Sequence, residues 1–180
     1  AGFCRQDYIG ADYGLVDCST GAPLPDFFTA LMWTHVMGPT VLSARLTDES
    51  GSVVGDGAVV RAAAHCLAAG ESAAPSSGGV GLMLSNLSNR STTARFDPDL
   101  GGVSRVYVLE PSPDPTASLT GEAGLLGTGV TLNGVLLRAA ADGTVARPVA
   151  AAGHGGNASL PAHSIAFFAL SQANHPDCRQ

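Results

Sequence analysis

The chain has 180 residues, of which 45% are hydrophobic and 13% are charged, so its composition is that of a folded protein and not of a disordered one. Its net charge of −6 argues against nucleic acid as a partner and against a polybasic membrane-binding surface. No apolar run is long enough to span a bilayer, and the first residues include neither an initiator Met nor a signal sequence, so we expect the chain to begin inside a longer polypeptide.

The first 38 residues have the pattern of one β/α unit. A short strand over 2–9 precedes a loop over 10–25 that is rich in Gly and Pro. Asp26 is expected to be the N-cap of a helix that ends at Gly38, and apolar residues recur at helical spacing from Phe27 onward. We expect this apolar stripe to pack on the wall of an α/β barrel, a fold in which active sites lie on the loops after the strands.

Beyond residue 40 the pattern changes to short β segments separated by Gly, Pro, Ser and Asp. The expected strands are 41–46, 58–66, 80–86, 91–96, 104–110 and 164–170, with a hairpin over 131–136. Asn133-Gly134 stands between two apolar runs in this hairpin and is a strong signal for a tight turn. Seven or eight such strands predict an antiparallel β-sandwich, so the chain as a whole is expected to be of the α+β class.

Cysteine and histidine spacing predicts neither a metal site nor a cofactor. The four Cys form no CxxC pair, and the five His show no spacing typical of metal ligands. Three Asn-x-Ser sequons begin at Asn86, Asn89 and Asn157, and we expect all three to be glycosylated. Together with the even number of Cys they favour a secretory route, toward the extracellular space or cell wall, or toward a lysosome or vacuole.

Several motifs, in order along the chain, resemble glycoside hydrolase family 79 and in particular its plant heparanase-like β-glucuronidases. They are Phe3-Cys4-Arg5-Gln6, Ile9-Gly10-Ala11-Asp12-Tyr13-Gly14-Leu15, and the segments 25–33, 61–66, 84–87, 131–134 and 161–168. The resemblance implies an (α/β)8 barrel with an appended β-sandwich. Residues 1–40 would be the last strand, loop and helix of the catalytic barrel, and residues 41–180 would be the C-terminal β-sandwich domain.

The resemblance also implies that the intact protein is a retaining β-glucuronidase acting on a glucuronide-containing glycan or glycoside. Such enzymes need two carboxyl groups about 5–5.5 Å apart. In this family both are Glu residues on earlier barrel strands, upstream of Ala1. The chain's own glutamates, all in or beside expected sandwich loops, are Glu49, Glu71, Glu110 and Glu122. We therefore expect no catalytic residue in this chain, which would be inactive without the upstream barrel segment.

The resemblance assigns substrate positioning to the loop after the first strand. The Tyr13 hydroxyl and the backbone N–H of Ala11 would donate to the uronic carboxylate of the sugar, which accepts strong charge-assisted hydrogen bonds. Gly10, Asp12 and Gln6 complete the expected substrate-binding set. Ala11 stands where the family usually has Gly, and Asp12 where it usually has Asn. A carboxylate at Asp12 would repel a uronate unless it points away or is paired.

The resemblance implies a disulfide between Cys66 and Cys178, which would tie the C-terminal segment to the sandwich. Cys4 would be a buried thiol on the strand. Cys18 would be either free or paired outside the chain.

The competing hypothesis is a non-catalytic β-sandwich module for glycan binding or structural support. The chain's only Trp, Trp33, falls on the expected helix. Sandwich lectins usually expose aromatic residues on one face, so the sandwich alone has the features of a support and not of a lectin.

Overall fold

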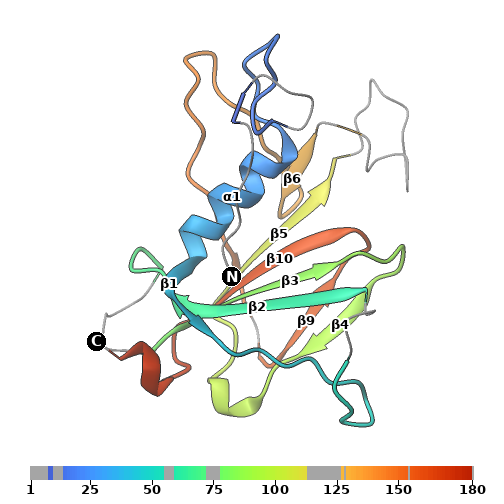
Figure 1. The fold of residues 1–180 in the computed structure, drawn as a ribbon, viewed down its shortest axis with the longest axis vertical. Coiled ribbons are helices and arrows are strands. Elements are labelled where there is room, and N and C mark those ends of the chain that lie inside the picture. Colours follow the sequence, from blue (N-terminus) through green and yellow to red (C-terminus); the bar gives the residue numbers. More distant parts are fainter. Residues whose placement is uncertain are drawn as a thin grey trace.

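A computed structural model describes residues 8–9, 14–54, 59–71, 78–112, 127, 129–153 and 155–179. Within these residues one α-helix, α1 (Pro25–Val36), precedes ten β-strands (Figure 1). The strands are β1 (Met37–Leu42), β2 (Val60–Leu67), β3 (Val80–Asn86), β4 (Thr92–Arg95), β5 (Arg105–Pro111), β6 (Val130–Leu132), β7 (Val135–Leu136), β8 (Ala151–Ala152), β9 (Asn157–Leu160) and β10 (Ser164–Leu170). Two short 3-10 helices are η1 (Pro98–Leu100) and η3 (Pro176–Cys178). No helix in these ranges is long and apolar enough to cross a membrane.

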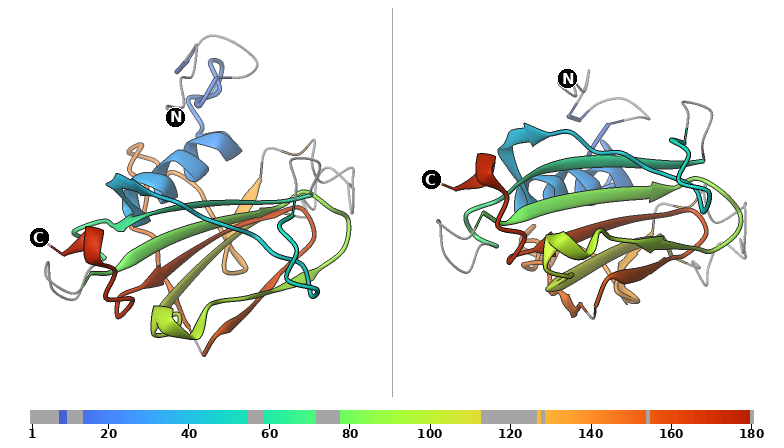
Figure 2. Two further views of the ribbon diagram at one scale, coloured as in Figure 1. Left: turned by 60° about the horizontal axis from the view of Figure 1, so that its bottom comes forward. Right: turned by 90° about the horizontal axis from the view of Figure 1, so that it is seen from below.

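Eight strands form one antiparallel sheet in the order β1-β2-β3-β10-β5-β6-β7, with β8 also paired to β5. The last strand in the sequence, β10, therefore lies in the middle, between β3 and β5. The remaining strands, β4 and β9, pair with each other as a separate two-stranded sheet. Figure 2 shows α1 on one side of the large sheet and the β4–β9 sheet on the other.

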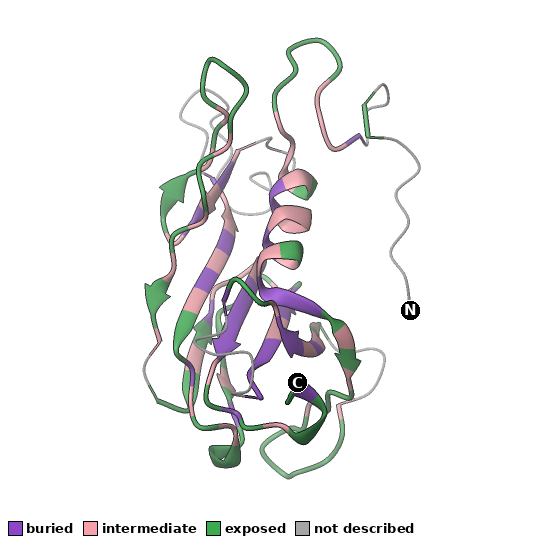
Figure 3. Cartoon of the chain, turned by 90° about the vertical axis from the view of Figure 1, so that its left-hand side faces the viewer, coloured by how far each residue is buried: buried purple, intermediate pink, exposed green. Residues whose placement is uncertain are grey.

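The central strand β10 explains why the fold has three layers. Successive side chains of a strand point to opposite faces of its sheet. Phe167 and Ala169 lie in the core shared with α1, whereas Phe168 and Leu170 lie in the core shared with β4 and β9. All four side chains are completely buried. The buried positions are concentrated in the strands that α1 crosses (Figure 3).

Helix α1 forms where it was expected, but both of its ends differ from the prediction. Its N-cap is Leu24 and Pro25 opens the first turn, so Asp26 lies inside that turn and is not the cap. At the other end the backbone is already extended at Met37 and continues directly into β1, so Gly38 does not adopt the predicted left-handed cap conformation. The expected division between residues 40 and 41 falls inside β1 and stays a prediction.

The apolar stripe of α1 packs on the large sheet of this chain. Phe28, Met32 and Val36 are its buried residues, and they join Tyr107 and Phe167 of the sheet in one core. The sequence predicts a barrel wall as the packing partner, whereas among the described residues the stripe packs on the sheet of its own chain. The mixture of one helix with antiparallel strands confirms the α+β class for the described residues.

Most predicted strands form close to their expected places, and 80–86 and 164–170 coincide with β3 and β10. The hairpin prediction is also confirmed, because Asn133 and Gly134 both have positive φ (49° and 80°) between β6 and β7. Two short strands, β8 and β9, were missed. The expected strand over 2–9 lies outside the described residues except for Tyr8 and Ile9, and Ile9 forms only an isolated bridge to Val16.

Gly38 permits the close pairing of β1 with β2, and its replacement tests that pairing. A Cβ atom at Gly38 would lie 2.6 Å from the carbonyl oxygen of Cys66, a backbone atom that cannot swing away. We expect Gly38→Ala to lower the free energy of unfolding by about 1–3 kcal/mol, as over-packing typically does. Urea denaturation measures it. Gly70→Ala is the matched control, because no atom lies within 4 Å of its added Cβ. Equal losses in the two variants would contradict the expectation.

Candidate functional site

The segment expected to contact the uronate lies outside the described residues. It comprises Gln6, Gly10, Ala11, Asp12 and Tyr13, and Cys4 lies outside as well. The roles assigned to these residues stay predictions. The structure does describe the residues on either side of this segment and the helix that follows it.

Backbone hydrogen bonds fold the loop before α1 into a defined shape. The N–H groups of Leu15 and Val16 both donate to the carbonyl oxygen of Tyr8, at 2.9 and 3.1 Å. The N–H of Leu24 donates to the carbonyl oxygen of Leu15 at 2.9 Å, directly before the helix begins. These bonds join Tyr8, on one side of the predicted binding segment, to residues on its other side and to the start of α1.

A tight turn at Asp17 stabilises the same loop. Its carboxylate oxygen Oδ1 accepts hydrogen bonds from the hydroxyl of Ser19 at 2.7 Å and from the backbone N–H groups of Ser19 and Thr20 at 2.8 Å. These bonds, above all that from the Ser19 hydroxyl, lower the pKa of Asp17 to about 2. Cys18 lies in this turn with an exposed, free thiol. Asp17 therefore shapes the loop as a permanently charged turn former.

A small hollow lies beside the first turn of α1. It has a volume of about 160 Å³ and is lined by Asp26 and Thr29 of the helix, Glu110 of β5 and His163 before β10, among others. Ligand pockets typically measure 300–1,000 Å³, so this hollow is too small to hold a sugar by itself. Within the described ranges no three His, Cys, Asp or Glu side chains are arranged to hold a metal ion. The described residues do not by themselves form a complete sugar-binding site.

Glu71 forms a buried polar cluster that sequence reasoning missed. Its side chain is 3% exposed; its Oε1 lies 3.0 Å from Nε2 of His35 in the last turn of α1. Its Oε2 accepts a hydrogen bond from Nη1 of Arg105 in β5, also at 3.0 Å, which raises the pKa of that guanidinium. The hydroxyl of Tyr107 lies 3.4 Å from the same His35 nitrogen. The cluster joins the end of α1 to the large sheet, and no local pattern in the sequence predicts it.

Tyr107 makes the cluster sensitive to alkaline pH. Burial, followed by the nearby Glu71 carboxylate, raises the pKa of the Tyr107 phenol to about 12. The folded state thus holds this proton more tightly than the unfolded state, whose phenol has a pKa of about 10. The resulting stabilisation, about 2–3 kcal/mol, is present below pH ~10 and is lost as the pH rises toward ~12.

We expect Tyr107→Phe to remove this loss of stability between pH ~10 and ~12, because phenylalanine has no proton to release. Denaturant unfolding at a series of alkaline pH values measures the effect. Tyr8→Phe is the control, since Tyr8 is 60% exposed. If the Tyr107→Phe variant loses stability over this range as steeply as the unsubstituted protein, the phenol is not responsible.

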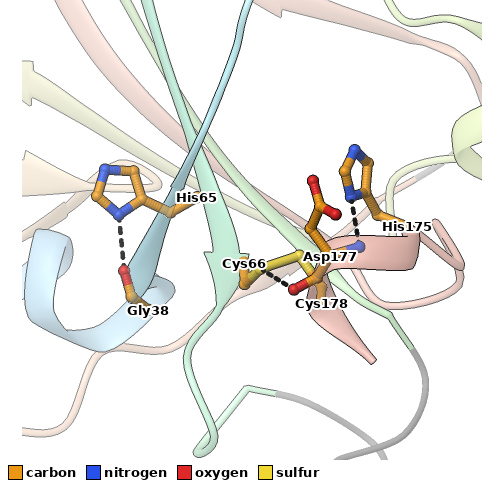
Figure 4. Close-up of a disulfide and its surroundings, with 6 residues drawn as sticks. All are labelled: Gly38, His65, Cys66, His175, Asp177 and Cys178. Carbon is orange, nitrogen blue, oxygen red and sulfur yellow. Dashed lines mark hydrogen bonds between the residues drawn. A yellow bond between two sulfur atoms is a disulfide. The ribbon is translucent and has the colours of Figure 1, made fainter. Parts of the chain in front are cut away.

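The structure contains the disulfide that the family resemblance implied. Cys66 at the end of β2 is bonded to Cys178 in η3, across a sequence separation of 112 (Figure 4). Two histidines beside it make local hydrogen bonds. Nδ1 of His175 accepts from the backbone N–H of Asp177 at 3.3 Å, and Nδ1 of His65 lies 2.6 Å from the carbonyl oxygen of Gly38. The disulfide holds the C-terminal segment against β2, and the contact of His65 with Gly38 holds β1 against β2.

The structure places Asn86, one of the three residues at which a glycan is expected, in the core. This side chain is completely buried, and its Nδ2 lies 2.8–3.2 Å from the carbonyl oxygens of Arg90, Leu160 and Pro161. This burial argues against the glycan expected at Asn86. Asn89 and Asn157 are exposed, and the expected glycans at these two residues stay predictions.

Comparison with known proteins places these observations in a family, although no family model matches the chain. The chain is 37% identical over 89 residues to heparanase-like protein 1 of Arabidopsis thaliana, covering 49% of this chain and 14% of that protein. It is 32% identical over 110 residues to baicalin-β-D-glucuronidase of Scutellaria baicalensis, covering 61% of this chain and 18% of that protein. It is 31% identical over 180 residues to heparanase of Mus musculus, covering 97% of this chain and 30% of that protein.

The chain thus spans less than a third of the length of each of these relatives. The similarity nevertheless extends over almost all of its own residues in the mouse protein, and two of the three relatives are from plants. The chain therefore belongs to the heparanase-like proteins of glycoside hydrolase family 79, and it corresponds to the C-terminal portion of such a protein.

Proposed function

We propose that this chain is the C-terminal part of a retaining β-glucuronidase that acts on a glucuronide-containing glycan or glycoside. The observation that carries the proposal is the similarity over 97% of the chain to a heparanase, together with the similarity to a baicalin-β-D-glucuronidase. The relative from Scutellaria baicalensis is named as a β-D-glucuronidase, which favours a glucuronic acid unit in the substrate.

In this proposal residues 1–40 are the last strand, loop and helix of the catalytic barrel. The composition of α1 supports it, because its apolar residues extend beyond the side that packs on the large sheet, and apolar helix surface is normally covered. One side of α1 packs on the large sheet through residues such as Phe28 and Met32. Ala30 and Leu31 stay partly exposed among the described residues. The upstream barrel would cover this second side, so α1 would lie between the two domains.

The catalytic glutamate pair of the proposed enzyme lies upstream of this chain. A retaining mechanism needs two carboxyl groups about 5–5.5 Å apart. Among the described glutamates, Glu71 is already engaged by Arg105 and His35, and Glu49 is exposed on the surface. This chain would instead supply the hydroxyl of Tyr13 and the backbone N–H of Ala11, which donate to the uronate carboxylate. Without the upstream barrel it is expected to be inactive.

The proposed enzyme follows the secretory route. The disulfide between Cys66 and Cys178 supports this, because such bonds persist in oxidising compartments and are rare in the cytosol. The two exposed sequons at Asn89 and Asn157 are consistent with the same route.

The proposal is tested with the full-length protein and an aryl β-glucuronide as substrate. We expect hydrolysis, and we expect Tyr13→Phe to lower kcat/KM by about 10- to 100-fold, because a hydrogen bond to a charged group contributes about 1.5–3 kcal/mol. Tyr107→Phe removes the same hydroxyl from a tyrosine in the core between α1 and the large sheet, outside the proposed subsite, so it is the matched control and should leave kcat/KM unchanged.

Two outcomes would contradict the proposal. A folded full-length protein without activity on any aryl glycoside would favour the non-catalytic support module. If the Tyr13→Phe variant had the same kcat/KM as the unsubstituted protein, Tyr13 would not bind the uronate. The glycosidase assignment would still hold.

A further inference from the structure

The asparagines of the three sequons differ in burial: Asn86 is completely buried, whereas Asn89 and Asn157 are exposed. Nδ2 of Asn86 carries two hydrogens and faces three carbonyl oxygens, so every donor is used. Its Oδ1 accepts from the backbone N–H of Ser88 at 3.1 Å and from the Ser88 hydroxyl at 2.7 Å. Both residues that define this sequon, Asn86 and Ser88, thus act together as a clamp that holds the end of β3 against the connection between β9 and β10.

A glycan on Asn86 would destroy this clamp. N-glycosylation transfers an oligosaccharide from a polyprenyl diphosphate carrier to the amide nitrogen. Nδ2 forms a bond to the anomeric carbon and loses one proton, while the carbon–oxygen bond to the diphosphate breaks and the diphosphate keeps the electron pair. The product has one N–H in place of two, and a sugar where the contacts to Leu160 and Pro161 lie in this structure. At a side chain that is 0% exposed, this product and the native packing exclude each other.

The other two asparagines lie at the two ends of the β4–β9 sheet. Asn157 is the first residue of β9 and is paired with Arg95 at the end of β4. Asn89 is exposed and precedes the start of β4 by three residues, at the end of the sheet where Thr92 pairs with Leu160. A sugar attached at either position meets solvent and not core.

The outer face of the β4–β9 sheet is polar. In the middle of both strands the residues alternate, with Ala94 and Ala158 turned to the core and Thr93 and Ser159 exposed, while Thr92 at the start of β4 is exposed as well. Such alternation is typical of an antiparallel sheet with one solvated face. The sheet therefore has a surface that does not need a protein partner, in contrast to the partly exposed apolar residues of α1 on the opposite side of the molecule.

We propose that Asn89 and Asn157 carry N-linked glycans, that Asn86 carries none, and that the β4–β9 layer faces solvent in the full-length protein. The proposal rests on the secretory route given above. The proposal also fixes how the chain is oriented relative to the upstream barrel. The glycan-bearing β4–β9 layer and the barrel would lie on opposite sides of the large sheet.

The test uses full-length protein secreted by a eukaryotic host. Peptide N-glycanase in water labelled with heavy oxygen converts each glycosylated Asn to a labelled Asp. Trypsin cleaves after Arg61 and Arg90, so Asn86 and Asn89 fall in one peptide, and fragmentation of that peptide must separate them. We expect the label at Asn89 and Asn157 and an unlabelled Asn86. Label at Asn86 in the secreted, folded protein, or its absence from Asn89 or Asn157, overturns the proposal.

Two variants form a matched pair, because each removes one sequon through its Ser residue. Ser91→Ala should remove one glycan, seen as a gel shift, without loss of secreted yield. Ser88→Ala should leave the number of glycans unchanged and lower the secreted yield several-fold, because Asn86 and Arg90 lose hydrogen bonds to the Ser88 hydroxyl. A shift with Ser88→Ala overturns the proposal.

Digestion of the native protein tests the orientation, since both glycans should be released without denaturation. Resistance of either glycan in the native protein would show a covered layer and overturn this part. The activity of the same preparation on the aryl β-glucuronide is measured separately. An active enzyme without glycans at Asn89 and Asn157 would contradict this inference and leave the proposed function intact. A protein that carries both glycans but is inactive would contradict the proposed function and leave this inference intact.

Discussion

Replacing both bonded cysteines, Cys66→Ala with Cys178→Ala, is expected to lower the free energy of unfolding by about 4–5 kcal/mol. The physical reason is that the bond closes a loop across a sequence separation of 112, which removes conformational entropy from the unfolded chain. A folded domain typically has only about 5–15 kcal/mol in total, so this loss is a large part of its stability. Equilibrium denaturation in guanidinium, with and without reductant, measures it.

Cys18→Ala is the control for this result, because its thiol is exposed and free. It should change the free energy of unfolding by less than about 0.5 kcal/mol, as surface substitutions usually do. The entropic account would be wrong if the double variant lost less than about 1 kcal/mol. Reductant should destabilise the unsubstituted protein and leave the double variant unchanged, which separates the bond itself from the packing of the two side chains.

The elements that the sequence predicted well are those with strong local signals. The strands β3 and β10 are continuous apolar runs, and such runs fit strands that are buried on both faces. The turn at Asn133 and Gly134 was predictable because both residues tolerate the positive φ that this hairpin needs. In each case the local sequence and the tertiary environment favour the same conformation.

The elements that were missed depend on distant parts of the chain. The strands β8 and β9 are short, and their residues are mostly poor strand formers such as Ala and Asn. They exist because β5 and β4 offer pairing edges. The end of α1 was predicted from Gly38, but the chain leaves the helix earlier, at Met37, because β1 pairs there with β2. Gly38 serves the close approach of two strands and not a helix cap.

The candidate site was predictable only in part. The family resemblance led to the disulfide and to the binding segment around Tyr13, and the structure describes the first and not the second. The Glu71 cluster could not be predicted, since Glu71 is more than thirty residues from both His35 and Arg105 along the chain and meets them only in the folded state. Asn86 shows the opposite case, in which a local motif predicts a modification and the tertiary structure gives the side chain another role.

Glu71→Gln is expected to lower the free energy of unfolding by about 2–3 kcal/mol. The substitution keeps the size of the side chain but removes the negative charge that His35 and Arg105 share. Hydrogen bonds to charged groups contribute about 1.5–3 kcal/mol, and breaking a buried ion pair leaves the partner charge uncompensated. Arg105 is 46% exposed and can turn to water, so the loss should stay below the 3–5 kcal/mol typical of fully buried pairs.

Glu49→Gln is the matched control for the cluster, because it makes the same chemical change at an exposed residue and should alter stability by less than about 0.5 kcal/mol. A double-mutant cycle of Glu71→Gln with Arg105→Met measures how much of the loss belongs to that ion pair. Indistinguishable stabilities of the Glu71→Gln and Glu49→Gln variants would mean that the cluster does not hold α1. Helix α1 would then depend on its apolar stripe and on its direct continuation into β1.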